Sequence, residues 1–317
     1  MAAGGPRKAG LPGGGGGLAA GISGTVRLLR GLLVVAAVLP PALLAGASWQ
    51  DWRRLEDEAF DRASRTAALL HEHALKVFQS HEAILDRVED HVRGKGWDEI
   101  GRSREMHETL RRMAGSDGQI SSVLLLAPDG RLAATSSVFP IAREIDNSDR
   151  GYYIAARDGI QGTYIGEPLI GRVSGRPILN VSRRRNASDG SFDGVVVVAV
   201  LLDYFSSFYR ELAPDGADSV SLVRADGTVI TRTPAVSTGV ARVPASANLM
   251  RRITEGQERA TFLGNSTLDG TERIYSFRRV GDYPVYVTYG LGVAAIGEAW
   301  LHATLIYGAL AAASALG

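Results

Sequence analysis

Five side chains in the middle of the chain have the chemistry needed to hold a small carboxylate ligand. They are Arg150, Tyr152, Tyr153, Tyr164 and Asp203. A buried carboxylate needs a fixed cation because an unpaired charge is costly to remove from water, and the planar guanidinium of arginine can bind both oxygens. Tyrosine rings can line a ligand pocket and provide a hydroxyl group for hydrogen bonding, while an aspartate could pair with an ammonium group of the ligand. The set predicts a binding site for a small anionic metabolite.

Each of these residues also has a structural interpretation. Arg150 could tie down its own loop through Asp146 or Asp149. The tyrosines could be core aromatics, and Asp203 could cap the helix that follows it. Arg176 could add a second cation, although a solvated loop charge is the simpler interpretation.

Other chemistries lack the residues they require. The chain has no cysteine, which excludes disulfides, cysteine-ligated zinc, iron–sulfur clusters and thiol nucleophiles. Its six histidines show no zinc spacing with a third ligand, and no phosphate-binding loop or nucleophile elbow occurs. The net charge of +1 favours neither nucleic acid nor a strongly charged partner. The sequence therefore predicts no enzyme activity, no metal site and no cofactor in this region.

A repeated pattern indicates how the binding residues are positioned. Residues Ser122–Thr135 and Ser219–Arg232 each contain a short apolar run, an Asp-Gly turn and a second short run. Asp-Gly between apolar runs is typical of a β-hairpin because it supplies the positive φ angles of a tight turn. Two copies predict two similar modules in series, each an antiparallel sheet with helices, which is the α+β class.

Further elements surround these hairpins. Residues 49–92 contain no glycine or proline and repeat apolar residues every three, four or seven positions, which predicts one long amphipathic helix. A short helix is expected near 100–113, strands at 177–183 and 194–202, and a connecting helix at 203–212. Residues 136–171, rich in glycine, aspartate, arginine and tyrosine, are expected to be irregular.

Apolar segments flank the two modules. Residues 27–48 carry few charges and are long enough to cross a bilayer, and the basic residues at and before their start place the N-terminus in the cytoplasm. A cleaved signal peptide ending at 45–47 is the alternative. The predicted organisation is a glycine-rich cytoplasmic tail (1–26), a transmembrane helix (27–48), a long periplasmic helix (49–93), a membrane-distal module (94–215), a membrane-proximal module (216–298) and a second transmembrane helix (299–317), which the end of the chain could truncate.

An ordered set of motifs resembles the double Cache family (dCache, or PDC), tandem PAS-like sensor domains of bacterial membrane receptors. The motifs lie at Asp146–Tyr153, Gly162–Pro168, Ser174–Pro177, Ser182–Arg184 and Asp189–Val196, and the resemblance covers residues 48–298. It implies a periplasmic receptor for small molecules, anchored in the inner membrane. Such domains usually drive histidine kinases, diguanylate cyclases or chemoreceptors, and a homodimer is expected.

The resemblance also assigns roles within the site. In the amino-acid-binding branch, Arg150 matches the leading arginine, Tyr153 the tyrosine and Asp203 the terminal aspartate, with Tyr164 a looser match. Tyr152 stands where that branch has tryptophan, so a plain organic acid remains an alternative to an amino acid.

Two questions stay open at this level. Residues 234–260 hold no aromatic residue and nothing like Arg150–Tyr153, so the ligand site is predicted in the membrane-distal module alone. The main hypothesis is a sensor that signals by helix rearrangement to a histidine kinase beyond this chain. The alternative is a two-anchor interaction or scaffold protein that modulates a partner signalling protein and has no ligand of its own.

Overall fold

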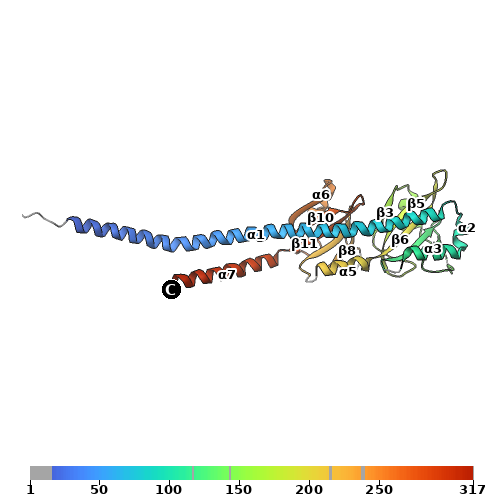
Figure 1. Ribbon diagram of the computed structural model, residues 1–317. Coiled ribbons are helices and arrows are strands. Elements are labelled where there is room, and N and C mark those ends of the chain that lie inside the picture. Colours follow the sequence, from blue (N-terminus) through green and yellow to red (C-terminus); the bar gives the residue numbers. More distant parts are fainter. Residues whose placement is uncertain (1–15, 116–117, 143, 214–215, 237–239, 317) are drawn as a thin grey trace, which may run out of the picture. The chain divides into compact units, whose positions relative to one another are not determined.

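The computed structural model describes residues 16–115, 118–142, 144–213, 216–236 and 240–316. The chain forms two compact units, one of Met1–Glu56 with Gly297–Gly317 and the other of Asp57–Ile296 (Figure 1). The first 15 residues of the expected glycine-rich tail lie outside the described residues.

Most helices and strands lie where the sequence patterns predict them. The helices are α1 (Gly16–Val92), α2 (Trp97–Arg102), α3 (Arg104–Ala114), α4 (Gly151–Arg157), α5 (Leu202–Leu212), α6 (Asn248–Thr254) and α7 (Ala294–Leu316). The strands are β1 (Ile120–Leu126), β2 (Leu132–Thr135), β3 (Thr163–Ile165), β4 (Leu169–Ile170), β5 (Pro177–Asn186), β6 (Phe192–Leu201), β7 (Ser219–Arg224), β8 (Val229–Thr233), β9 (Arg259–Asn265), β10 (Glu272–Arg279) and β11 (Val285–Gly292). The stretch expected to be irregular contains α4, β3 and β4.

The smaller unit contains the apolar start of α1. Among the described residues, one helical stretch is long and apolar enough to cross a membrane: it is Arg27–Val92 of α1, with a mean hydropathy of 2.1 over its most apolar window. The second expected span, residues 299–317, coincides with α7 as far as Leu316 and stays a prediction, and Gly317 lies outside the described residues. Within this unit, Trp300 Nε1 donates to the Ser48 carbonyl at 2.9 Å, and the Trp300 ring meets Trp52 edge-on at 5.4 Å.

The larger unit contains two antiparallel sheets of the same design. The first has the order β2-β1-β6-β5-β3 with β4 beside β5, and the second has the order β8-β7-β11-β10-β9. Each hairpin turns at the expected Asp-Gly, where Gly130 and Gly227 take φ angles of +86° and +87°. We call β1–β6 with α2–α4 the first module and β7–β11 with α6 the second. The α+β fold with a long helix and two tandem sheets is confirmed.

The core lies where α1 passes both sheets. The small and apolar side chains of α1, Ala63, Ala67, Leu70, Ala74 and Phe78, are fully buried in one cluster with residues from both sheets. The opposite sheet faces carry two separate clusters, covered in the first module by α4 and in the second by α6. These outer faces are covered only by a short helix and loops, which leaves room for pockets.

Candidate ligand-binding site

The first pocket lies on the outer face of the first sheet, under the start of α4. Arg150 is the N-cap residue of α4, and its backbone carbonyl accepts hydrogen bonds from Tyr153 N and Ile154 N, both at 3.0 Å. The pocket is lined by residues of β1, the segment before α4, α4 itself, β4, the β4–β5 loop and β5: Ser122, Leu124, Asn147, Arg150, Tyr152, Leu169, Gly171, Arg172, Val173, Ser174, Ile178 and Asn180. Its volume of about 20 Å³ holds roughly one water molecule.

The Arg150 guanidinium makes no ion pair with a described residue. Its Nη2 donates to the Ile170 carbonyl at 3.3 Å. The structural role considered for it belongs instead to Arg172, whose Nη1 and Nη2 bind the Asp149 carboxylate at 2.8 and 2.6 Å. Arg150 is therefore a half-buried cation at the pocket that is available for an anion.

Tyr152 lines the pocket as a neutral phenol. Burial raises the pKa of its hydroxyl to about 12, so the proton stays on oxygen at neutral pH. That hydroxyl donates to Asn147 Oδ1 at 3.3 Å. A ligand oxygen could replace Asn147 Oδ1 as the acceptor of this long hydrogen bond without leaving a charged group unpaired.

Asn180 is the functional candidate that the sequence did not single out. It lies on β5 with 1% of its surface exposed, and neither its Oδ1 nor its Nδ2 has a hydrogen-bond partner among the described residues. It pairs in register with Ala199 on β6, and Ser122 of β1 pairs with the same residue from the other side. A buried amide without partners is costly, so these atoms point to a missing ligand or water.

The other three predicted residues do not line this pocket. The Tyr153 hydroxyl donates to the Pro128 carbonyl at 2.6 Å, and its ring packs edge-on against Phe192. Tyr164 on β3 has the Arg224 guanidinium 5.5 Å from its ring centroid. Asp203 on α5 is exposed, and its Oδ2 pairs with Arg176 Nη2 at 3.2 Å. The structure thus brings together Arg150 and Tyr152 of the five.

Comparison with solved structures identifies the family. The extracellular domain of a protein classed as a histidine kinase, rpHK1S-Z16, is 31% identical, with a TM-score of 0.65, and the match covers 74% of this chain and 95% of that one. The chain belongs to the double Cache sensor family. A family model described as a histidine kinase sensor domain (dCache_1-like) also matches residues 202–290.

Two chemoreceptor domains of lower sequence identity share the fold alone. The periplasmic sensory domain of the Campylobacter jejuni chemoreceptor Tlp1 is 12% identical, with a TM-score of 0.59, and the match covers 76% of this chain and 98% of that domain. The ligand-binding domain of the Pseudomonas fluorescens chemoreceptor CtaA, solved with L-serine, is 13% identical, with a TM-score of 0.52. The match covers 75% of this chain and 98% of that domain. No curated protein matches the sequence significantly. The relatives are extracellular sensor domains rather than catalytic ones.

The buried amide of this Cache domain allows a first prediction. Replacing Asn180 with leucine should raise the free energy of unfolding of the ligand-free protein by about 1–3 kcal/mol, because an unsatisfied polar group is exchanged for an apolar one of similar size. The same change should abolish ligand binding at the pocket. Urea unfolding of the variant measures the change in stability, and titration of the variant with a ligand that binds the wild type measures the change in binding. A variant that is destabilised and still binds would show that Asn180 has only a structural role.

Proposed function

We propose that the first Cache module senses a small carboxylate, either an amino acid or an organic acid, for a bacterial membrane receptor. The single observation that carries this proposal is the unpaired Arg150 beside the partnerless Asn180 in one pocket. A guanidinium and an amide supply the charge-assisted and neutral hydrogen bonds that a carboxylate accepts.

The pocket chemistry bears on which carboxylate is bound. The relatives CtaA and Tlp3 were solved with L-serine and L-valine, respectively. In this chain the carboxylate expected to face an ammonium group, Asp203, is paired with Arg176 and exposed. An amino acid would therefore require this ion pair to open, whereas an organic acid would not.

Ligand entry requires the pocket to enlarge. The present volume of about 20 Å³ suits one water molecule, and four of the lining residues, Gly171, Arg172, Val173 and Ser174, belong to the loop between β4 and β5. An outward shift of this loop would admit a ligand, and binding would then favour the open arrangement over the closed one. Ligand binding would therefore change the conformation of the first module.

Glu82 on α1 contacts both modules and so connects the ligand-binding module to the long helix. Its carboxylate accepts hydrogen bonds from Thr163 and Arg183 of the first module and, at 2.6 Å, from Tyr283 of the second. Burial alone would raise the pKa of Glu82, but the hydrogen bonds from Thr163 and Tyr283 and the charge of Arg183 lower it overall, so the group is ionised at neutral pH. A movement of the first sheet would thus act on α1.

The proposal extends to the rest of the receptor. We propose that residues 27–48 anchor α1 in the inner membrane with the N-terminus in the cytoplasm and that residues 49–298 lie in the periplasm. Residues 299–317 would form the second span. The receptor would act as a homodimer and pass the signal to a histidine kinase domain. Leu69, 64% exposed on α1, is available for a contact between the two copies.

A thermal-shift screen of the full chain in detergent tests the ligand proposal. A ligand at 100 times its dissociation constant should stabilise the protein by about 2.7 kcal/mol, which is a measurable rise in melting temperature. Amino acids and small organic acids form the screen, with the matching amines and amides as controls. A folded protein that responds to none of the carboxylates would contradict the proposal and favour the scaffold alternative.

A further inference from the structure

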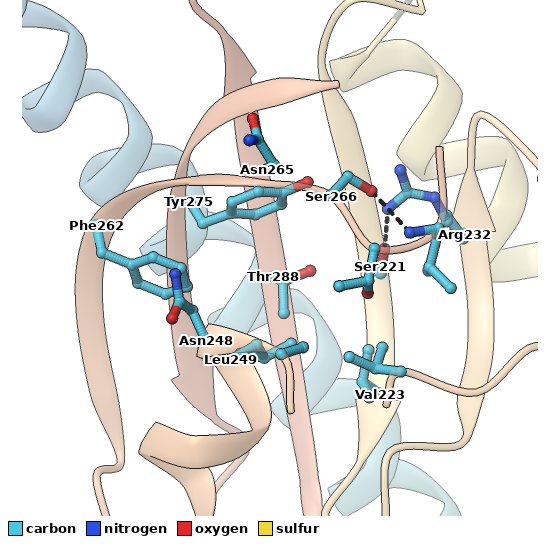
Figure 2. Close-up of a pocket in the computed structure, with 14 residues that line it drawn as sticks. Ser221, Val223, Arg232, Asn248, Leu249, Phe262, Asn265, Ser266, Tyr275 and Thr288 are labelled. Carbon is cyan, nitrogen blue, oxygen red and sulfur yellow. Dashed lines mark hydrogen bonds between the residues drawn. The ribbon is translucent and has the colours of Figure 1, made fainter. Parts of the chain in front are cut away.

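The second module contains a pocket on its outer sheet face, with a volume of about 50 Å³ (Figure 2). It lies between α6, strands β7–β11 and the loop after β9, and Figure 2 shows Thr288 and Ser221 between the Phe262 and Tyr275 rings on one side and Arg232 on the other. The sequence predicted a ligand site in the first module alone, because this module has no counterpart of Arg150–Tyr153.

The two pockets occupy equivalent positions in the repeat. In each module the glycine of the Asp-Gly turn accepts a hydrogen bond from the segment that leads into the short helix: Gly130 from Asn147 N at 2.9 Å, and Gly227 from Val243 N at 2.8 Å. The second residue of the following helix lines the pocket in both cases, as Tyr152 in α4 and Leu249 in α6. The second pocket is therefore the repeat counterpart of the first.

A buried excess of positive charge lies at its edge. The side chains of Arg232 and Arg273 are only 6% and 1% exposed, and both bind the one carboxylate of Asp269, at 2.8 and 2.9 Å. Two guanidiniums thus share a single counter-charge. Moreover, the Nε atom of Arg232 is buried without a hydrogen-bond partner among the described residues. A buried, incompletely satisfied cation favours an anionic guest.

The remaining walls define what kind of anion fits. Val223, Val243, Leu249, Phe262 and Leu268 supply an apolar lining, while Ser221 and Thr288 bring hydroxyl groups from the sheet. The Ser221 oxygen accepts a hydrogen bond from Arg232 Nη1 at 3.1 Å, so its proton can be donated to a ligand. No aspartate or glutamate is among the described residues that line the pocket, and the nearby Asp269 is already paired with two arginines, which disfavours an ammonium group.

We propose that this pocket binds a short-chain aliphatic monocarboxylate of about two to four carbons, a size set by its small volume. The carboxylate would lie toward Arg232, Ser221 and Thr288, and the alkyl chain toward Leu249 and Phe262. The second module would then carry a sensor site of its own, with its cation on edge strand β8 rather than at a helix start. This site is independent of the proposed Arg150 site and does not rest on it.

Calorimetric titration of the full chain in detergent with propionate tests the proposal. We expect saturable binding of propionate, with acetate and butyrate also binding and with propionamide and propylamine failing to bind at the same concentrations. Leu249→Trp, which fills the pocket, should abolish propionate binding. Thr288→Val, which removes one hydroxyl and keeps the shape, should weaken it at least about fivefold.

Matched variants distinguish binding in this pocket from binding elsewhere on the protein. Leu263→Trp places the same ring on an exposed position of β9, 48% exposed and outside the pocket, and should bind propionate as the wild type does. Arg157→Gln, which changes an exposed arginine of the first module that lines neither pocket, should also leave the affinity unchanged. Propionate binding that survives both Leu249→Trp and Thr288→Val would overturn the proposal. Absence of propionate binding to folded wild type would do the same.

Discussion

Replacing Asp269 with asparagine is expected to lower the free energy of unfolding by about 3–5 kcal/mol at neutral pH, the cost of leaving a buried ion pair without one partner. Asp269 is the shared counter-charge of Arg232 and Arg273, whose side chains are almost fully buried. Asparagine keeps the size and one acceptor oxygen but removes the charge, so both guanidiniums would lose their ionic partner. Urea unfolding of the two proteins measures the difference.

The pH dependence of that difference provides an independent check. Burial would raise the pKa of Asp269, but hydrogen bonds from Arg273 and Ser266 and the charge of Arg232 hold it well below its ordinary value of 3.8. A carboxyl whose pKa is lower in the folded protein contributes stability that is complete above about pH 4 and is lost as the pH falls through the folded pKa. The gap between wild type and variant should therefore be constant near neutrality and shrink below about pH 4.

A matched control distinguishes the ion pair from a general effect of removing a negative charge. Asp282→Asn changes an exposed aspartate in a turn of the same module and should alter stability by less than about 0.5 kcal/mol. Equal losses in Asp269→Asn and Asp282→Asn would refute the importance of the shared carboxylate.

Replacing Arg183 with glutamine is expected to destabilise the fold by about 2–3 kcal/mol at pH 7, less than at a fully buried pair because one partner, Asp86, is 61% exposed. Arg183 on β5 faces three carboxylates of α1: it pairs with Asp86, and with Glu82 and Glu89 at 3.3 Å each. Without the guanidinium, three like charges would share one helix face. Chemical denaturation at pH 7 measures the loss.

The loss in Arg183→Gln should become smaller as the pH falls toward 5. Burial already raises the pKa of Glu89 above its usual value, against the lowering influence of Arg183. Removal of Arg183 raises that pKa further, so the folded variant binds more protons than its unfolded state and gains stability on acidification. Arg87→Gln, on the same helix, is the control and should leave stability unchanged. A loss that grows on acidification would contradict this interpretation.

Local patterns predicted the elements whose signals lie within a short stretch of sequence. The Asp-Gly turns fixed both hairpins, because only a few residue types accept their backbone angles. The absence of glycine and proline from residues 49–92 predicted the helical course of α1. Helix α4 was missed, because its seven residues are too few to show a helical period.

The pockets were harder to predict because they depend on pairing between distant strands. Arg150 stands out by its residue type, but Asn180 looks like any polar residue of a strand until β1, β6 and β5 are placed side by side. In the second module no ligand site was predicted, because the module has no counterpart of Arg150–Tyr153. Arg232 lines its pocket from β8, where it pairs in register with Ser221 on β7. Such proximity cannot be read from spacing along the chain.

The sensor role depends most on Arg150, and a calorimetric titration tests it directly. The carboxylate that gives the largest thermal shift is titrated into the wild type, Arg150→Gln and Arg157→Gln, an exposed arginine of the same helix whose partner is Asp158. We expect Arg150→Gln to fold normally and bind about 100-fold more weakly, since a charge-assisted hydrogen bond is lost. Arg157→Gln should bind like the wild type. Unchanged affinity in Arg150→Gln would contradict the proposed site and leave Arg150 as a loop residue.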